Sequence, residues 1–255
     1  MRKVKKNSLL YKSGVEYADF CINHVQGCSH GCKYPCYAMV MAKRFGKVKD
    51  YNDWMRPAIV ENSLELLEKE IPKYKDRIDF VHLSFTTDPF MQGYPEVGDL
   101  TLKIIERLNK DSIKCTVLTK GVYPKKIAKK DTYGHNNMYG ITLVSLDEGF
   151  RKDFEPHSAK FKQRIKSLKH LSDKGLKTWV SMEPYPTPNL VAQDLTEILN
   201  ELSFVDKIVF GKLNYNVRVK KSEDSDKFYA KCANEVVNFC KHNKIDYHIK
   251  YGTPK

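Results

Sequence analysis

The sequence of 255 residues has no apolar run of the roughly 18 residues that a membrane-spanning helix needs. It also contains no low-complexity tract, no internal repeat and no linker rich in glycine or serine. The basic residues 1–6 are not followed by the apolar segment of a secretory signal. We therefore expect a cytoplasmic protein without membrane association, folded as a single domain over residues 1–255.

Acidic residues are in the minority, with 31 Asp and Glu against 44 Lys and Arg, which gives a net charge of +13. A basic surface favours partners that carry phosphate, because neutralising phosphates releases counterions. The lysines are nevertheless spread along the whole chain, as on an ordinary solvated surface. The charge alone leaves nucleic-acid binding open.

Three of the seven cysteines, Cys28, Cys32 and Cys36, fall within nine residues. In a reducing compartment, such spacing indicates a metal site more often than a disulfide framework. The four scattered cysteines are interpreted as core thiols, with a radical-quenching role as an alternative for the first of them. These are Cys21, Cys115, Cys232 and Cys240.

Short β-rich runs alternate with amphipathic stretches, a pattern that indicates a parallel sheet with helices outside. We expect an α/β fold, a partial (β/α)6 TIM-like barrel with an extra C-terminal strand. Its core would span about residues 16–212, and residues 213–255 would form an extension. Strands are predicted at 16–25, 80–85, 113–118, 139–146, 177–182, 207–210 and 247–250. Helices are predicted at 37–46, 62–72 (ended by Pro72), 100–108 (behind turn residues Gly98 and Asp99), 124–130, 160–173, 191–202 and 227–242.

Polar residues follow the predicted strands, where barrels of this kind carry their chemistry. Lys120 and Lys212 are two of them, and either would bind an anionic substrate or a cofactor carboxylate if it is not simply solvated. Glu183 is a candidate for a contact to substrate or to a cofactor ribose. The polar segments lie at residues 28–36, 86–88, 119–120, 145–147, 183–184 and 212–214.

The cysteine loop allows two kinds of metal site. Three thiolates can bind three irons of a cubane cluster and leave the fourth iron open for a ligand. A zinc site would instead need a fourth ligand, and His24 or His30 is near enough in sequence to supply it. Gly27 and Gly31 would let the loop backbone come close to either group.

Residues 23–38 (NHVQGCSHGCKYPCYA) resemble the cluster loop of the spore photoproduct lyase-like branch of the radical S-adenosylmethionine (SAM) superfamily. The resemblance continues in order through residues 86–96 (TTDPFMQGYPE), 119–120, 145–147 and 155–156, and covers about residues 23–188. One departure is the spacing C-x3-C-x3-C, where the family has C-x3-C-x2-C. Pro35 is then an inserted residue, which changes the backbone path before Cys36.

The resemblance implies a role for each matched position. Cys28, Cys32 and Cys36 would hold a 4Fe–4S cluster. The methionine moiety of SAM would lie against Thr86, Thr87 and Asp88, and its ribose and carboxylate would face Ser145 and Arg164. Tyr34 and Tyr37 would stack on adenine or relay a hydrogen atom.

The resemblance further implies a radical SAM enzyme of lyase or transferase type that abstracts hydrogen from a substrate, with a nucleic-acid base as the first expectation. It would need an electron donor such as a flavodoxin or a ferredoxin, and a partner protein could shape its pocket. The dimer-splitting lyase has a cysteine hydrogen donor just before its conserved Asp. Residues 84–87 (SFTT) contain none, which argues against repair of thymine dimers. The alternative is a non-catalytic zinc or iron–sulfur protein that binds nucleic acid.

Overall fold

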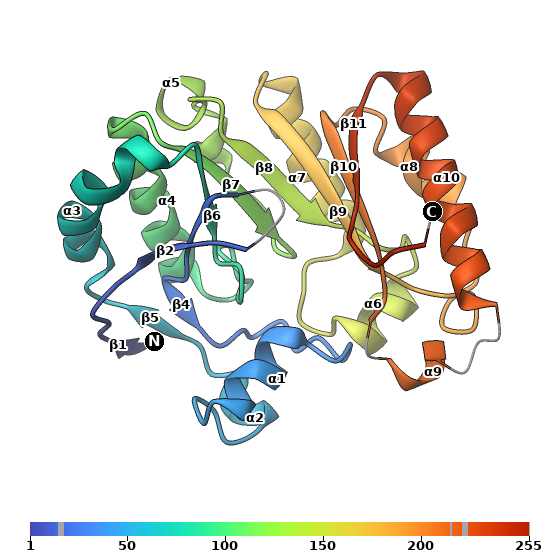
Figure 1. The fold of residues 1–255 in the computed structure, drawn as a ribbon, viewed down its shortest axis with the longest axis horizontal. Coiled ribbons are helices and arrows are strands. Elements are labelled where there is room, and N and C mark those ends of the chain that lie inside the picture. The colour runs from blue at the N-terminus through green and yellow to red at the C-terminus, as the bar shows by residue number, and fades with distance from the viewer. Residues whose placement is uncertain (15–17, 215, 221–223, 255) are drawn as a thin grey trace.

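The computed structural model describes residues 1–14, 18–214, 216–220 and 224–254 of the chain. Within these residues the main sheet has eight strands in the order β11-β10-β9-β8-β7-β6-β3-β2. Neighbouring strands run parallel except β2, which pairs antiparallel with β3. The edges are β2 and β11, so the sheet forms an open, partial barrel (Figure 1). The strands are β2 (Leu10–Lys12), β3 (Phe20–Ile22), β6 (Phe80–Leu83), β7 (Lys114–Thr119), β8 (Met138–Thr142), β9 (Lys177–Tyr185), β10 (Lys207–Lys212) and β11 (Asp246–Ile249).

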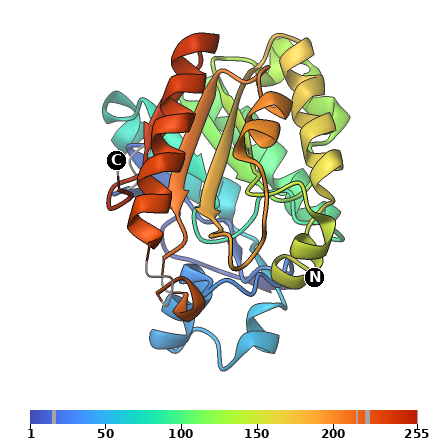
Figure 2. The ribbon, with the colours of Figure 1, turned by 90° about the vertical axis from the view of Figure 1, so that its right-hand side faces the viewer.

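Helical crossovers connect the parallel strands and cover the outer face of the sheet (Figures 1 and 2). The expected α/β partial barrel with an added C-terminal strand is therefore confirmed. The carboxyl ends of the strands open toward α1 and α2, at the bottom of Figure 1. The other helical elements between the strands are α3 (Ser63–Tyr74), η1 (Lys75–Arg77), α4 (Pro95–Lys110), η2 (Lys125–Ala128), α5 (Lys130–Tyr133), α6 (Glu148–Phe154), α7 (Phe161–Asp173), α8 (Leu195–Glu201), α9 (Val217–Lys220) and α10 (Ser225–Asn243), of which α6 and α9 lie at the open end (Figure 1).

Side chains fill the barrel interior below this opening. The indole ring of Trp179 packs against Gly140, where a Cβ atom would overlap the ring, and its Nε1 donates to the carbonyl oxygen of Val117 at 3.1 Å. His82 packs edge-on against the same indole and lies with Nδ1 2.7 Å from Thr116 Oγ1. These rings separate the open end of the barrel from a small cavity of about 220 Å³ that Trp179 and Thr116 help to line.

A smaller sheet lies next to the open end, with the strand order β1-β5-β4. β1 pairs parallel with β5, and β4 pairs antiparallel with β5. The chain between β4 and β5 carries the three closely spaced cysteines and two short helices. These elements are β1 (Arg2–Val4), β4 (Val25–Gln26), β5 (Ala58–Val60), α1 (Tyr37–Arg44) and α2 (Tyr51–Trp54).

Several predicted boundaries are wrong for local reasons. Pro72 lies inside α3 rather than at its end. Gly98 and Asp99 are not turn residues, because α4 already begins at Pro95, where a proline fits the first helical turn. The predicted strand 16–25 is divided into β3 and β4, and its first residue, Glu16, lies outside the described residues.

Other elements differ at one end or were not predicted. The helix predicted from Val191 begins at Leu195, behind Asp194, whose side chain accepts from Thr196 N at 2.8 Å. The short elements β1, β2, β5, α2 and α6 had no prediction. None of the helices in the described ranges is long and apolar enough to cross a membrane.

Candidate functional site

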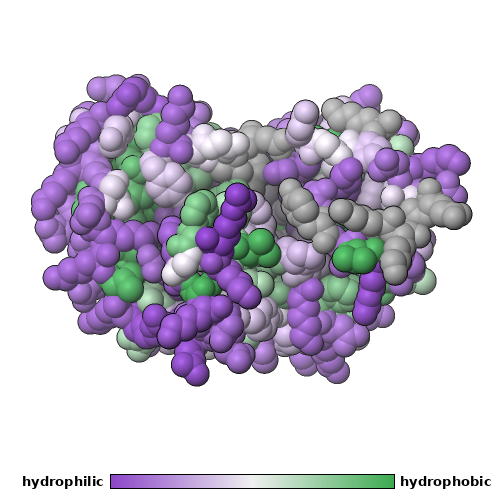
Figure 3. All heavy atoms as spheres, turned by 60° about the horizontal axis from the view of Figure 1, so that its bottom comes forward, coloured by the Kyte–Doolittle hydropathy of each residue, from purple (hydrophilic) through white to green (hydrophobic). Residues whose placement is uncertain are grey.

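The carboxyl ends of the strands surround a cavity of about 440 Å³. Cys28, Cys32 and Cys36 line one side of it, and the ends of β9, β10 and β11 line another. Figure 3 views the molecule with this end brought forward and shows hydrophilic side chains around scattered hydrophobic ones. Of the predicted site residues in the described chain, the cavity is lined by Cys28, Cys32, Tyr34, Cys36, Tyr37, Thr86, Thr87, Asp88 and Glu183.

Backbone contacts hold the cysteine loop in place. Gly27 has a φ of +79°, and a Cβ atom there would lie 2.6 Å from the carbonyl oxygen of Trp54, which also accepts from Cys28 N at 3.0 Å. Further along, Lys33 N donates to Phe154 O at 2.8 Å. Cys36 is the N-cap residue of α1. The loop is therefore fixed against α2 on one side and α6 on the other.

The three loop cysteines are free thiols that face one cavity. Burial raises the pKa of Cys28 well above its usual value, with a further contribution from the charge of Asp88. Burial also raises the pKa of Cys32 to about 12. In the metal-free protein these two thiols keep their protons, which metal binding must displace.

The arrangement of the histidines does not supply the fourth ligand of a zinc site. His24 is fully buried, with Nε2 2.7 Å from Thr101 Oγ1 and Nδ1 3.4 Å from Ser84 Oγ. His30 accepts from Gln92 N at 3.3 Å and faces Asp88 with its other nitrogen at 3.4 Å. Among the described residues, no three His, Cys, Asp or Glu side chains converge as one metal ion would require. Three thiols without a fourth ligand fit a cubane cluster with one open iron.

The carboxylate of Asp88 accepts several hydrogen bonds at the open end of the barrel. Its carboxylate accepts from Thr119 Oγ1 at 2.6 Å and from the backbone N–H groups of Phe90 and Lys120 at 2.8 and 2.7 Å. The same carboxylate lies 3.4 Å from His30 Nδ1, in the cysteine loop. Asp88 therefore ties the loop to the ends of β6 and β7 while lining the cavity.

The two tyrosines beside Cys36 have different surroundings. Tyr34 is buried, with its ring 5.2 Å from that of Phe154 and the Lys120 ammonium 5.1 Å from its centroid. Burial and the charge of Glu155 raise the pKa of its hydroxyl well above the usual value. Tyr37 is 55% exposed. Tyr37 can therefore meet a ligand from solvent, whereas Tyr34 forms part of the cavity wall.

Two predicted cofactor contacts, Ser145 and Arg164, are not among the described residues that line the cavity. Ser145 Oγ accepts from Asp147 N at 3.0 Å, and Asp147 caps α6. The fully buried guanidinium of Arg164 donates to Glu155 at 2.6 Å and to the carbonyl oxygen of Thr142 at 2.9 Å. Neither side chain lines the cavity in the described chain, and their direct contacts to a cofactor remain a prediction.

Glu155 connects this buried arginine to the cavity, a role that sequence reasoning missed. Its carboxylate bonds both Arg164 and the ammonium of Lys120. Burial alone would raise the pKa of Glu155, but the charges of Lys120 and Arg164 lower it to about 2. Glu155 is 35 residues from Lys120, so no local pattern could reveal the pair.

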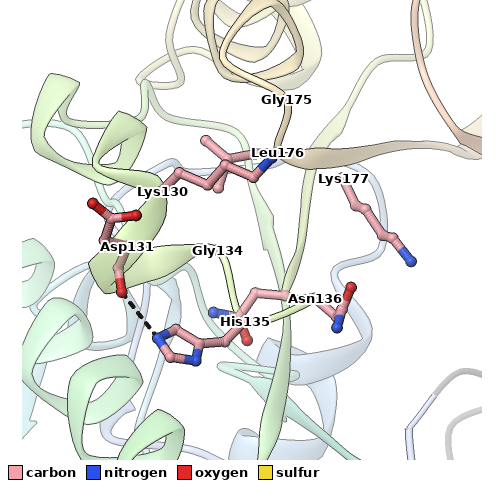
Figure 4. A pocket seen from close by; sticks show the side chains of 9 residues that line it. Lys130, Asp131, Gly134, His135, Asn136, Gly175, Leu176 and Lys177 are labelled. Atoms are coloured by element: carbon pink, nitrogen blue, oxygen red, sulfur yellow. Dashed lines mark hydrogen bonds between the residues drawn. The ribbon is translucent and has the colours of Figure 1, made fainter.

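A second cavity, of about 520 Å³, lies at the opposite end of the strands. The loops before β8 and β9 line it, with His135 Nε2 3.1 Å from the carbonyl oxygen of Asp131 (Figure 4). No predicted site residue belongs to its described lining. The candidate active site is therefore the cavity at the cysteine loop.

The model of the radical SAM superfamily matches residues 22–202 of the chain. This protein belongs to the radical SAM superfamily. It is an enzyme, and its cofactors are a 4Fe–4S cluster and SAM. When both are bound, reductive cleavage of SAM supplies the 5′-deoxyadenosyl radical. The free cysteines at the cavity fit this group.

Two curated relatives are similar to this radical SAM protein. One is an uncharacterized protein, ORF301, of Acidianus two-tailed virus, 27% identical over 226 residues, covering 82% of this chain and 73% of the relative. The other is an uncharacterized protein, MJ0683, of Methanocaldococcus jannaschii, 26% identical over 214 residues, covering 83% of this chain and 77% of the relative.

Solved structures show the same fold. A spore photoproduct lyase complexed with dinucleoside spore photoproduct has a TM-score of 0.73 at 13% identity and covers 98% of this chain and 81% of that one. A double mutant of spore photoproduct lyase, with bound AdoMet and dinucleoside spore photoproduct, has a TM-score of 0.71 at 14% identity, with the same coverage. SuiB of Streptococcus suis, bound to S-adenosylmethionine, gives 0.52 at 16% identity and covers 72% of this chain and 42% of that one.

Proposed function

We propose that this radical SAM enzyme abstracts a hydrogen atom from a nucleic-acid base held at the open end of the barrel. The observation that carries the proposal is the set of residues that line one cavity. Cys28, Cys32 and Cys36 face it from one side, while polar strand ends face it from the other. A cofactor bound at the cysteines thus leaves a wall of the cavity for substrate. The net charge of +13 supports a phosphate-rich substrate.

The residues at the cysteine side have separate proposed roles. Cys28, Cys32 and Cys36 hold the cluster. Thr86, Thr87 and Asp88 position the methionine part of SAM, and Glu183 contacts its ribose or the substrate. Asp88 is suited to a positioning role, because its carboxylate accepts hydrogen bonds at the end of β7 and also lies 3.4 Å from His30 of the cysteine loop.

Tyr37 is the proposed relay for a hydrogen atom. The cavity lining in the described chain contains no cysteine besides the three proposed ligands. A thiol donor like that of the dimer-splitting lyase is therefore not part of this proposal. Tyr37 lines the cavity and is exposed, so a substrate can approach its hydroxyl. Tyr34 lies deeper, beneath Lys120.

The decisive experiment is anaerobic reconstitution with iron and sulfide, followed by dithionite and SAM and an assay for 5′-deoxyadenosine. We expect cleavage in the parent protein and its loss in Cys28→Ala, Cys32→Ala and Cys36→Ala. Cys240→Ala, which alters a buried cysteine of α10, is the matched control and should retain the activity. Single-stranded oligonucleotides should then increase the turnover of SAM.

The second candidate is a non-catalytic zinc or iron–sulfur protein that binds nucleic acid. The three-cysteine loop favours it only if another side chain completes a zinc site, and both histidines near the loop are already hydrogen-bonded. A colourless reconstituted protein with one bound zinc and intact SAM would support this candidate and reject the radical reaction.

We also propose that an acidic electron carrier, a flavodoxin or a ferredoxin, docks on α1. This helix starts directly after Cys36, and none of its residues, all of which the structure describes, is buried. Val40 and Phe45 are exposed at 47% and 64%. Every charged residue of the segment 33–49 is basic. Apolar side chains among positive charges suit an acidic protein partner.

Charge reversal tests this docking surface. The double variant Lys43→Glu/Arg44→Glu should slow cluster reduction by reduced flavodoxin but not by dithionite. The control is Lys162→Glu/Lys166→Glu on the exposed face of α7. Equal slowing in both variants would contradict a specific surface. A loss of oligonucleotide binding without slower reduction would assign α1 to nucleic acid instead.

The reducing cytoplasm, where such carriers and free thiols coexist, remains the proposed location.

A further inference from the structure

The wall of the cavity opposite the cysteines contains a β-bulge. Phe210 of β10 pairs with Met182 of β9, but the next registered pair is Lys212 with Tyr185. Glu183 and Pro184 therefore lie opposite a single residue, Gly211. Bulges of this kind redirect side chains beside active sites. Here the irregularity immediately precedes Lys212, which lines the cavity.

Gly211 has no side chain at the point where two charged groups meet. A Cβ atom there would lie 3.0 Å from Glu183 Cδ and 3.0 Å from Lys250 Cγ. The two side chains pass over it, and Lys250 Nζ lies 3.6 Å from Glu183 Oε2. The positive charge of Lys250 is thus matched by a carboxylate within the cavity wall.

Lys212 has no carboxylate partner of this kind among the described residues. Among the described residues, three lysines line the cavity, of which Lys120 is paired with Glu155 and Lys250 with Glu183. Lys212 is half-buried, and within the part of the chain that the structure describes its ammonium forms no ion pair. The carboxylates in the described lining, Asp88 and Glu183, form no ion pair with this ammonium. A partly desolvated ammonium without a carboxylate partner favours an anion from outside the protein.

SAM is not suited to be that anion. Its single anionic group is the carboxylate of the methionine part, for which Thr86, Thr87 and Asp88 are the proposed contacts, and its adenosine part is uncharged. Lys120, at the end of β7, is the ammonium beside the cysteine loop. In the sheet order β7-β8-β9-β10, the strand of Lys212 is three positions from β7. At about 4.8 Å per strand, that separation is roughly 14 Å when it is followed along the curved sheet.

We infer that Lys212 binds a phosphate group of the substrate, with the Glu183–Lys250 pair beside it. The inference rests on the proposed function, because it places the substrate in the same cavity as the radical reaction. It also defines the substrate more closely, as a molecule whose phosphate reaches β10 while its reacting group faces the cysteines. The phosphate can belong to a nucleic-acid strand or to a small phosphate ester.

Binding measurements on the holoenzyme can separate these sources. The probes are thymidine, thymidine monophosphate and single-stranded oligothymidylate, with S-adenosylhomocysteine in place of SAM. The parent protein should bind both phosphate-bearing probes at least about fivefold more tightly than thymidine. In Lys212→Met this advantage should disappear, and the salt dependence of oligonucleotide binding should decrease by about one phosphate contact. Lys103→Met, on the exposed face of α4, is the control and should behave like the parent.

A measurement on the Lys212 ammonium itself tests the anion subsite without assuming which substrate the enzyme uses. Mass spectrometry measures the acetylation rate of Lys212 in inorganic phosphate and in chloride at equal ionic strength. Protection by phosphate without nucleotide binding would reject a nucleic-acid substrate but support the anion subsite, with a small phosphate ester as the source. Oligonucleotide binding that is identical in Lys212→Met and the parent would overturn the subsite and leave the nucleic-acid proposal intact. Absence of protection by phosphate and by every nucleotide would also overturn the subsite.

Discussion

Arg164 Nη2 lies 2.6 Å from Glu155 Oε2, and both side chains are completely buried. The same carboxylate bonds Lys120, whose ammonium lies over the ring of Tyr34 in the cysteine loop. A chain of charges therefore runs from the protein interior to the proposed cluster. Its members are fixed by one another rather than by solvent, so the loss of one leaves the others without compensation.

Replacing Glu155 by Gln should destabilise the protein strongly. The variant keeps the side-chain volume but leaves two buried cations facing a neutral amide, so we expect a loss of about 3–5 kcal/mol in the free energy of unfolding. Urea denaturation followed by circular dichroism measures it. Glu65→Gln, which breaks an exposed pair with Lys69, is the control and should leave the midpoint unchanged. Similar midpoints for the two variants would contradict the role assigned to Glu155.

The buried carboxylate also predicts acid sensitivity. The pKa of Glu155 is lowered from 4.5 to about 2, because the charges of Lys120 and Arg164 outweigh its burial. A lowered carboxyl pKa stabilises the folded state above the unfolded-state pKa, and this contribution is lost as the pH falls from about 4.5 toward 2. Denaturation at a series of acidic pH values should show the loss in the parent. In Glu155→Gln this part of the pH dependence should be absent.

Two buried histidines should destabilise the protein as the pH falls, and this effect should begin at a higher pH than that of Glu155. Burial lowers the pKa of His24 and of His82 from 6.5 to about 3, with smaller effects of Lys6 and Lys250 respectively. Between these values the unfolded state binds more protons than the folded state, so the free energy of unfolding falls as the pH drops from about 6.5 toward 3. The double variant His24→Gln/His82→Gln should lose most of this slope. An unchanged slope would mean that both rings are already protonated in the folded protein.

Gly27→Ala should impair cluster assembly. A Cβ atom at this position would lie 2.6 Å from the carbonyl oxygen of Trp54, in a backbone with φ +79°. The loop must shift to relieve the overlap, which displaces Cys28. We expect less iron per chain after reconstitution, measured by iron analysis and by visible absorption. Gly93→Ala is the matched control, because it has φ +83° but nothing within 4 Å of the added atom.

Gly140→Ala should destabilise the barrel itself. The added Cβ would overlap the indole of Trp179. A hydrogen bond from Nε1 of this ring to the carbonyl oxygen of Val117 holds it in place. Overpacking of this kind typically costs about 1–3 kcal/mol, so the thermal midpoint of the apoprotein should fall by several degrees. Gly14→Ala, with no described atom within 4 Å of the added Cβ, should leave the midpoint near that of the parent. Equal midpoints would show that the ring can move aside.

The sequence was sufficient to predict the barrel, because its parallel strands are short β-rich runs separated by helical stretches. The cysteine loop was predictable because its three thiols are close together in the chain. The small strands were not, since β1 and β5 have three residues each and β1 is largely exposed. Three residues cannot display a period, and the pairing of β1 with β5 joins segments more than 50 residues apart.

Outside the cysteine loop, the site residues were predicted where strand order determines their position. Thr86 and Asp88 follow β6, Glu183 lies near the end of β9, and the parallel sheet brings their positions to one end. Arg164 lies on a helix, where the sequence could not show whether it turns toward the cavity or toward Glu155. Two cations and one carboxylate assemble there from three separate segments, and only tertiary packing brings them together.

The indole of Trp179 also has a consequence for the size of molecule that this enzyme can accept. Together with His82, it fills the barrel below the cavity, so the proposed substrate must enter from the open end. A cavity of about 440 Å³ that is closed below receives one protruding group and leaves the remainder of a large molecule outside. A base rotated out of a nucleic-acid strand meets that requirement, because the strand itself can rest on the rim while a single ring enters.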